Sequence, residues 1–80
     1  MISTAPHYSS GEDVRCGDAV SYAGQRGTVV FVIDREEYTP EFPAADWSHY
    51  GRGFMLRFEN SALLMLEQAD EDLVLVHRTS

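Results

Sequence analysis

Carboxylates and aromatic rings are interleaved in one stretch of the chain, between residues 36 and 50. Carboxylates attract lysine and arginine, and Trp and Tyr are favoured anchors at protein interfaces. A connection of this length in a small domain is usually functional or disordered. The stretch therefore predicts a surface that binds a basic protein partner. The residues expected to carry it are Glu36, Glu37, Tyr38, Glu41, Asp46, Trp47 and Tyr50.

The rings of this stretch could also serve the protein's own core. Phe42 and Trp47 could fold back to cover one open end of the domain, while Tyr38 and Tyr50 point outward. The two arrangements are compatible, and the sequence leaves both open. A cage for methylated lysine, built from Tyr22, Trp47 and Tyr50, is a further alternative.

Metal binding and catalysis find little support in the residue spacing. Cys16, His7, His49 and His77 match no zinc-ligand pattern, and no third group completes a nucleophile-and-base pair. We expect no metal, no cofactor and no enzymatic activity, with Cys16 as a packing residue. A second acidic group lacks the alternating ligands and the glycine of known calcium loops, so it indicates a solvated turn. Its members are Glu67, Asp70, Glu71 and Asp72.

The charge balance points to the same kind of partner. Thirteen acidic residues face six basic ones, all arginine, for a formal net charge of -7. The arginines are scattered, whereas a nucleic-acid surface needs clustered cations, so binding to nucleic acid is not expected. A single cysteine suits a reducing compartment. No run of about 20 apolar residues and no secretory signal in residues 1–10 are present, so we expect a cytoplasmic protein without membrane contact.

Five short apolar segments predict strands at residues 18–22, 26–33, 54–59, 62–67 and 73–76. The run from Thr28 to Ile33 is β-branched or aromatic throughout, which indicates a central strand. Pro40 and Pro43 argue against a regular strand in the connection 34–52, and Pro43 predicts one helical turn over 44–47. A helix over residues 61–69 remains an alternative to the fourth predicted strand.

The strand pattern predicts a mostly β protein, a small five-stranded barrel in residues 14–80, preceded by a flexible tail in residues 1–13. The facing of the fully apolar strands stays open, because a one-residue slip exchanges the two faces. The side chains expected in the core are Val20, Tyr22, Val29, Phe31, Ile33, Phe54, Leu56, Phe58, Leu64, Leu66, Leu73 and Leu75.

The start of the predicted barrel resembles the opening of KOW and Tudor-type domains, which are small barrels of Src-homology topology. The residues that carry the resemblance are Gly17-Asp18, Val20, Gly24, Gly27, Val29 and Val32. It implies a Gly-Asp pair at the start of the first strand and association with RNA or with ribosomal and transcription proteins. The chain lacks the basic residues that RNA binding usually needs.

In size, acidity and its aromatic insertion, the chain also resembles small acidic bacterial immunity proteins as a class. The function expected from the sequence is therefore a protein-binding module, most specifically an immunity- or antitoxin-like inhibitor of a basic partner. The alternative is a KOW-like accessory domain of the ribosomal or transcription machinery. An enzyme is the third and least supported class.

Overall fold

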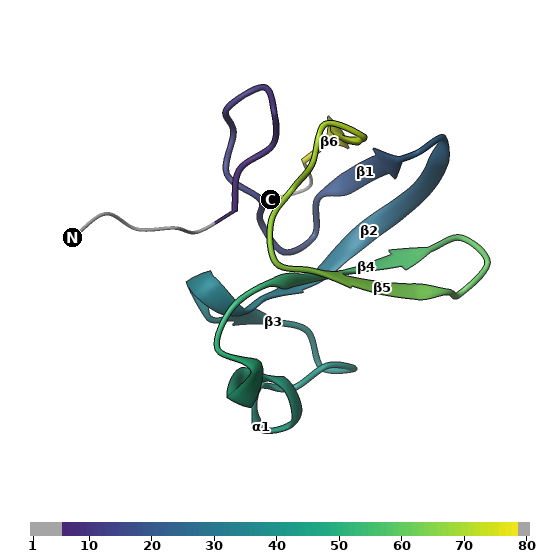
Figure 1. Cartoon of the computed structure of the whole chain (residues 1–80). Helices are drawn as coiled ribbons and strands as arrows, with labels where there is room; N and C mark the ends of the chain where they lie inside the picture. The colour runs from purple at the N-terminus through teal and green to yellow at the C-terminus, as the bar shows by residue number, and fades with distance from the viewer. Residues whose placement is uncertain (1–5, 79–80) are drawn as a thin grey trace.

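Six strands form one antiparallel sheet in the computed structural model, which describes residues 6–78 (Figure 1). The strands are β1 Ala19–Tyr22, β2 Gln25–Val32, β3 Glu37–Tyr38, β4 Phe54–Phe58, β5 Leu63–Leu66 and β6 Leu73–His77. Three short helical segments complete the fold: η1 Ile33–Arg35, α1 Ala44–Trp47 and η2 Ser48–Tyr50. No helix within these residues is long and apolar enough to cross a membrane.

The five predicted strands are confirmed as β1, β2, β4, β5 and β6. Residues 63–66 form a strand and not a helix, because the tight turn before them brings β5 back along β4. In that turn the Asn60 side chain accepts a hydrogen bond from the Ala62 amide, and Ser61 adopts the positive φ of 70°. The helical turn α1 is also confirmed, and it starts directly after Pro43.

The sheet is open. Its strands follow the order β5-β4-β2-β1-β6, and β3 pairs with β2 at Phe31 and Val32. The end strands β5 and β6 are not neighbours on this path, and residues 67–72 between them form bends and a turn without a ladder. The closed five-stranded barrel expected from the sequence is therefore not observed. The two-residue strand β3 was not expected, and it ends before Pro40.

A β-bulge in β2 decides which face each apolar residue of this strand occupies. Val29 lies opposite Leu56 and Phe31 lies opposite Met55, so β2 carries one extra residue at this point. The bulge breaks the two-residue alternation, and Val29 and Val32 end on one face of the sheet. Phe31 lies with the other face, although strict alternation would group it with Val29.

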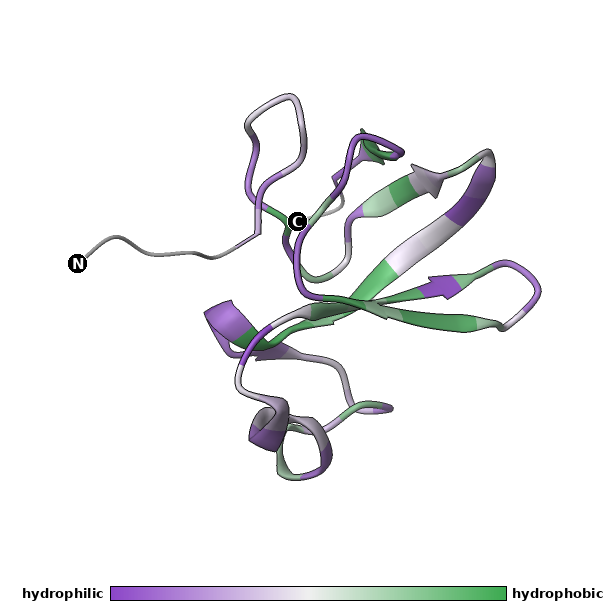
Figure 2. Ribbon diagram, viewed as in Figure 1, coloured by the Kyte–Doolittle hydropathy of each residue, from purple (hydrophilic) through white to green (hydrophobic). Residues whose placement is uncertain are grey.

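Each face of the sheet therefore has a core of its own, and Figure 2 shows the apolar residues along β2, β4 and β5 that supply both. The first core contains Tyr8, Val14, Val20, Val29, Val32, Phe54, Leu56 and Leu73. The second contains Val30, Phe31, Ile33 and Met55. Every residue of the expected core is buried or half-buried, but Phe31 and Ile33 belong to the second core.

Residues 6–13, expected as part of a flexible tail, pack against the first core as a hairpin. The Tyr8 amide donates to the Glu12 carbonyl at 2.8 Å, and the Val14 amide donates to the Pro6 carbonyl at 3.1 Å. Tyr8 itself is only 2% exposed. The packed domain thus begins before residue 14, because an aromatic ring from this segment completes the core. The rest of the expected tail, residues 1–5, and the last two residues, 79–80, lie outside the described residues.

Candidate functional site

The connection between β2 and β4 folds back onto the second face of the sheet, around Phe31. The Phe31 ring centre lies 5.9 Å from that of Tyr38, 5.9 Å from that of Phe42 and 5.2 Å from that of Trp47. Such distances are typical of favourable aromatic pairs. Phe42 and Trp47 therefore do fold inward, but they cover a face of an open sheet and not the end of a barrel.

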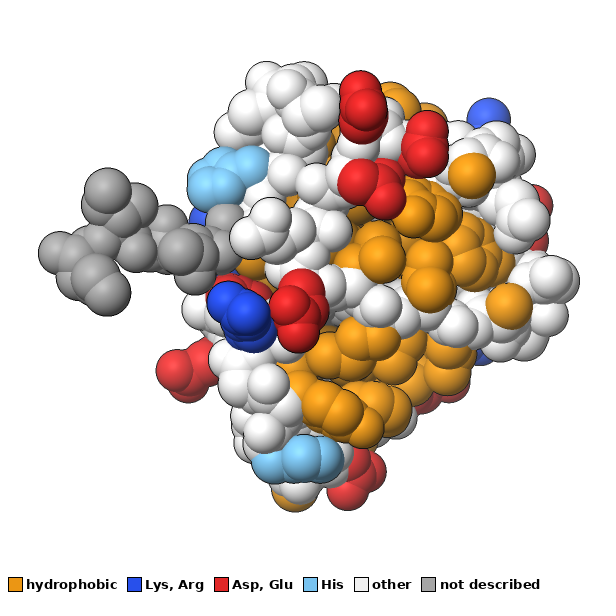
Figure 3. Space-filling model, in the orientation of Figure 1, with side chains coloured by type: hydrophobic (Ala, Val, Ile, Leu, Met, Phe, Trp, Pro, Cys, Tyr) orange, Lys and Arg blue, Asp and Glu red, His pale blue; other side chains and the backbone are white. Residues whose placement is uncertain are grey.

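The aromatic cluster continues outward from Trp47 to the surface. Tyr50 stacks on Trp47 with ring centres 5.6 Å apart, and His49 lies 4.4 Å from Tyr50. Trp47 is half-buried, whereas Tyr50 is 55% exposed. The space-filling view shows hydrophobic side chains gathered beside β5 and α1 (Figure 3). Together these rings make an aromatic surface, in which Trp47 packs on Phe31 of the second core.

The carboxylates of the predicted surface divide into internal and exposed groups. Glu37 binds the Arg15 guanidinium, with Nε at 2.8 Å, and accepts a hydrogen bond from the Cys16 amide at 2.9 Å. The Arg15 contact, opposed in part by burial, lowers the pKa of Glu37. Glu41 forms an ion pair with Arg57 across the sheet face. Glu37 is thus bound to Arg15 and Cys16 of the same chain, and its contact with a partner stays a prediction.

Glu36 and Asp46 are the carboxylates of the predicted set that remain exposed without an ion pair to any residue from 6 to 78. Asp46 lies in α1, directly before Trp47. Glu36 follows η1 in the left-handed conformation, with φ 55°. Of the seven predicted residues, Tyr38 and Trp47 both contact Phe31 and Tyr50 stacks on Trp47, whereas Asp46 is their neighbour only in sequence, directly before Trp47.

A buried carboxylate that was not predicted as a functional residue joins three distant segments. Asp18 is 1% exposed and accepts hydrogen bonds from the Tyr8 hydroxyl at 2.6 Å, the Arg15 amide at 2.9 Å and Arg78 Nε at 3.0 Å. Burial alone would raise the pKa of Asp18, but these bonds outweigh it and lower the pKa. The Gly-Asp pair before β1 was a signal for this residue, whereas Tyr8 lay in a polar segment without a pattern.

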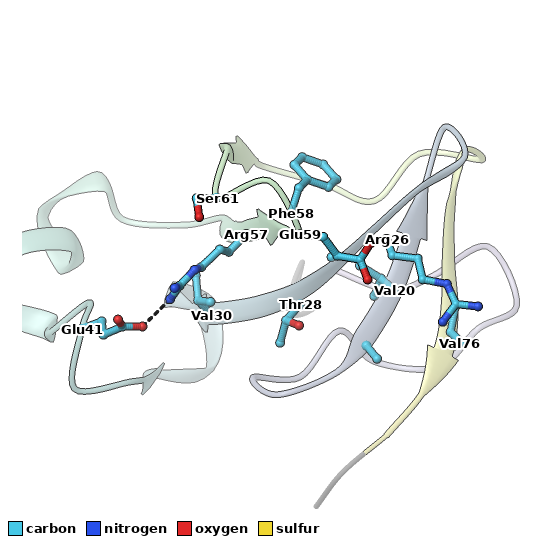
Figure 4. Close-up of a pocket in the computed structure, with 12 residues that line it drawn as sticks. Val20, Arg26, Thr28, Val30, Glu41, Arg57, Phe58, Glu59, Ser61 and Val76 are labelled. Atoms are coloured by element: carbon cyan, nitrogen blue, oxygen red, sulfur yellow. Dashed lines mark hydrogen bonds and ion pairs between the residues drawn. The ribbon is translucent and has the colours of Figure 1, made fainter.

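A groove of about 570 Å³ crosses the second face of the sheet (Figure 4). Val30 and Val76 contribute apolar surface to its lining, and the Arg57–Glu41 ion pair also lines it. Arg26 lines the groove too and is the one arginine of the chain without an ion pair to residues 6–78. Apolar walls with a few polar groups are the usual lining of small binding sites.

Three other candidate sites from the sequence are the methyl-lysine cage, the Cys16 thiol and a metal site. Tyr22 packs against the first core and its hydroxyl donates to Asp70 at 2.8 Å, so Tyr22 cannot form a cage with Trp47 on the opposite face. The Cys16 thiol lies 3.6 Å from the Val30 carbonyl, and burial raises its pKa, so the thiol stays protonated near pH 7. Within residues 6–78, no three His, Cys, Asp or Glu side chains gather as a metal site.

Comparison with known proteins does not assign the chain to a family. No family model, curated protein or solved structure matches it. The resemblances noted for residues 17–32 and for the acidic composition therefore stay expectations.

Proposed function

We propose that this chain is a protein-binding module that recognises a basic protein through the insertion between β2 and β4. The observation that carries the proposal is the stack of Tyr50 on Trp47, which itself rests on the buried Phe31. An exposed ring held in place by packed rings loses little conformational freedom on binding, which favours its use as an interface anchor.

The distribution of charge supports a basic partner. Five of the six arginines form ion pairs with acidic residues of the same chain, and eight of the thirteen acidic residues have no ion pair within residues 6–78. The negative charge is thus left at the surface. It steers positively charged proteins over a Debye length of about 8 Å at physiological salt.

The most specific form of this proposal is an immunity- or antitoxin-like role, in which the module covers the active site or substrate groove of a basic enzyme. Tyr50 and Trp47 act as anchors, and Asp46 pairs with a lysine or arginine of the target. This role needs no catalysis by the chain itself and places it in the cytoplasm with its target.

The test is affinity capture from the native host's lysate at low and high salt, with the bound material identified and then purified. The proposal predicts one stoichiometric basic protein, released by salt, whose enzymatic activity falls when the purified chain is added. Tyr50→Ala combined with Asp46→Asn should abolish capture and inhibition. Glu71→Gln removes the same single charge from the acidic turn and serves as the matched control, which should bind normally. Capture that is equally strong with the double variant contradicts the proposed surface.

A second candidate is a KOW-like accessory domain of the ribosomal or transcription machinery. It is favoured by the strand order, in which β1, β2, β4 and β5 are successive neighbours and β6 returns beside β1, as in barrels of Src-homology topology. Under this candidate a bound partner or a further movement would bring the ends of the sheet together. Ribosomal proteins or RNA in the eluate would support it and would contradict the inhibitor role.

A further inference from the structure

The groove on the second face of the sheet has a floor of short side chains beside a long one. Thr28 of β2 lies opposite Arg57 of β4 and opposite Ala19 of β1, so these residues form one row across the sheet. The next residues in β1 and β2, Val20 and Val29, lie in the first core, which places the row on the opposite face. Because Ala19 and Thr28 are short, a hollow of about 570 Å³ opens above them.

The charged side chains of the groove are balanced in number but not all paired. Among residues 6–78, two arginines and two glutamates line it. Arg57 and Glu41 form an ion pair at one end (Figure 4). Arg26 and Glu59 form no ion pair with any residue from 6 to 78. One positive and one negative group are thus left without an ionic partner in the same groove.

These two groups are held at neighbouring backbone positions. The Glu59 amide donates to the Arg26 carbonyl at 3.2 Å, where the end of β4 meets the start of β2. Both side chains are exposed, and Figure 4 shows them together, with the Arg57–Glu41 pair at the other end. A ligand with one carboxylate and one ammonium group satisfies both charges, whereas a simple anion is repelled by Glu59 and a simple cation by Arg26.

The uncharged part of the lining favours a ligand with apolar side chains and peptide groups. Val30 and Val76 supply apolar surface, and Thr28 and Ser61 each supply a hydroxyl. A hydroxyl both donates and accepts, so it can bind the carbonyl or the amide of a peptide bond. The volume lies within the range of about 300–1,000 Å³ that is typical of small-ligand sites. Charge, polarity and size therefore agree on a short peptide.

We propose that this groove binds a short apolar peptide with both ends free, its carboxylate at Arg26 and its ammonium group at Glu59. A guanidinium donates two parallel hydrogen bonds to a carboxylate, and contacts between charged groups are the stronger class of hydrogen bond. The inference goes beyond the proposed function and does not depend on it. Trp47 and Tyr50, the anchors of the proposed partner surface, are not among the residues that line the groove.

The test is an NMR titration of the isotope-labelled chain with the dipeptide leucyl-leucine. Amide signals of residues 26–30 and 57–61 should shift and saturate, whereas those of residues 46–50 should stay in place. Two modified dipeptides are the matched ligands: the C-terminal amide lacks the carboxylate, and the N-acetyl form lacks the ammonium group. Each modification should weaken binding to the unchanged chain about tenfold, the loss of one charged contact.

Variants of the chain assign each end of the peptide to its residue. Arg26→Gln should weaken binding of the unmodified dipeptide about tenfold but should not weaken binding of the amide further, because the same contact is already lost. Glu59→Gln should show this relation with the N-acetyl form. The spectra themselves verify that each variant is folded.

Matched changes outside the groove serve as controls. Arg52→Gln and Glu71→Gln each remove one exposed charge, of opposite sign, and should bind the dipeptide like the unchanged chain. Tyr50→Ala combined with Asp46→Asn should also bind it normally, even if this variant loses the basic protein partner. Failure of the groove and failure of the partner surface are therefore distinguishable.

Four outcomes overturn the proposal. The first is the absence of saturable shifts at residues 26–30 and 57–61. The second is equal affinity of the unmodified dipeptide and its two modified forms. The third is weakening by Arg52→Gln as large as that by Arg26→Gln. The fourth is binding of acetate, inorganic phosphate or free leucine as tightly as leucyl-leucine, which would show that the groove does not recognise a peptide.

Discussion

Asp18 is the one charged side chain that is fully buried among residues 6–78. It joins the N-terminal hairpin, the loop before β1 and the chain after β6 through Tyr8, Arg15 and Arg78. A carboxylate in this setting is stable only while its partners remain, because an unpaired buried charge or donor is costly.

Asp18→Asn should lower the free energy of unfolding by roughly 3 kcal/mol. The substitution removes the buried carboxylate charge that pairs with Arg78, and it weakens the hydrogen bond from the Tyr8 hydroxyl. Urea denaturation of the variant and of the unchanged chain measures the difference. Asp46→Asn, an exposed change of the same kind, should alter stability by less than about 0.5 kcal/mol. Equal effects of the two substitutions would show that Asp18 is not a structural link.

The pH dependence of stability follows from the lowered pKa values of Asp18 and Glu37. Both groups bind protons more weakly in the folded chain than in the unfolded chain, where the values are about 3.9 and about 4.3. Their contribution is fully present above these values and is lost as the pH falls through the lower folded values. Urea midpoints from pH 7 to acid pH should therefore decrease below about pH 4.5, and Asp18→Asn should flatten this decrease. An equally steep decrease in the variant would assign the effect to other carboxylates.

At the scale of elements, the insertion is held by rings and not by a regular ladder. Its rings pack on Phe31, and only β3 pairs with the sheet. Elements held in this way open more readily than the core strands.

Trp47→Ala should lower stability by about 2 kcal/mol, less than the cost of a fully buried ring, because Trp47 is half-buried. Tyr50→Ala should cost less than about 1 kcal/mol because its ring is mostly exposed. Hydrogen exchange of residues 44–50 should be faster in the Trp47 variant and nearly unchanged in the Tyr50 variant. Similar exchange in both variants would show that Trp47 does not hold the insertion.

The approach of β4 to β5 depends on Gly53. Its φ is 115°, and a Cβ atom at this position would lie 2.8 Å from the Leu66 carbonyl oxygen. Gly53→Ala should therefore cost about 2–3 kcal/mol, through strain and displacement of β5. Gly24 has a φ of 84° but open space around its Cβ position, so Gly24→Ala isolates the conformational penalty of about 1 kcal/mol. Equal losses in thermal or urea stability would indicate that β5 shifts without resistance.

At the scale of the whole molecule, the N-terminal hairpin is part of the domain. A chain that starts at residue 14 loses Tyr8 from the first core and a partner of Asp18. The loss should reach about 3–5 kcal/mol, a large share of the roughly 4–12 kcal/mol expected for a domain of this length. Urea denaturation of the truncated chain measures it. A truncated chain as stable as the full one would confirm the tail expected from the sequence.

The strands and the candidate surface were predictable to different degrees. Local composition located the five strands and the helical turn α1, because β-branched runs, prolines and tight turns act over a few residues. It also predicted Trp47 and Tyr50 as anchors of a binding surface, a role that stays a prediction. The ion pair between Arg15 and Glu37, which lie 22 residues apart, could not be predicted. That contact depends on how the loop before β1 packs against β3.

The mostly β class, the strongly acidic balance and the aromatic character of the insertion follow from residue types and short-range spacing alone. The faces that the apolar residues occupy became clear from the folded chain, because the bulge in β2 interrupts the alternation that would otherwise assign them. The folded chain also shows that Tyr8 is buried and that β5 and β6 remain apart. Each of these features depends on contacts between segments far apart in the chain, whose geometry no local pattern contains.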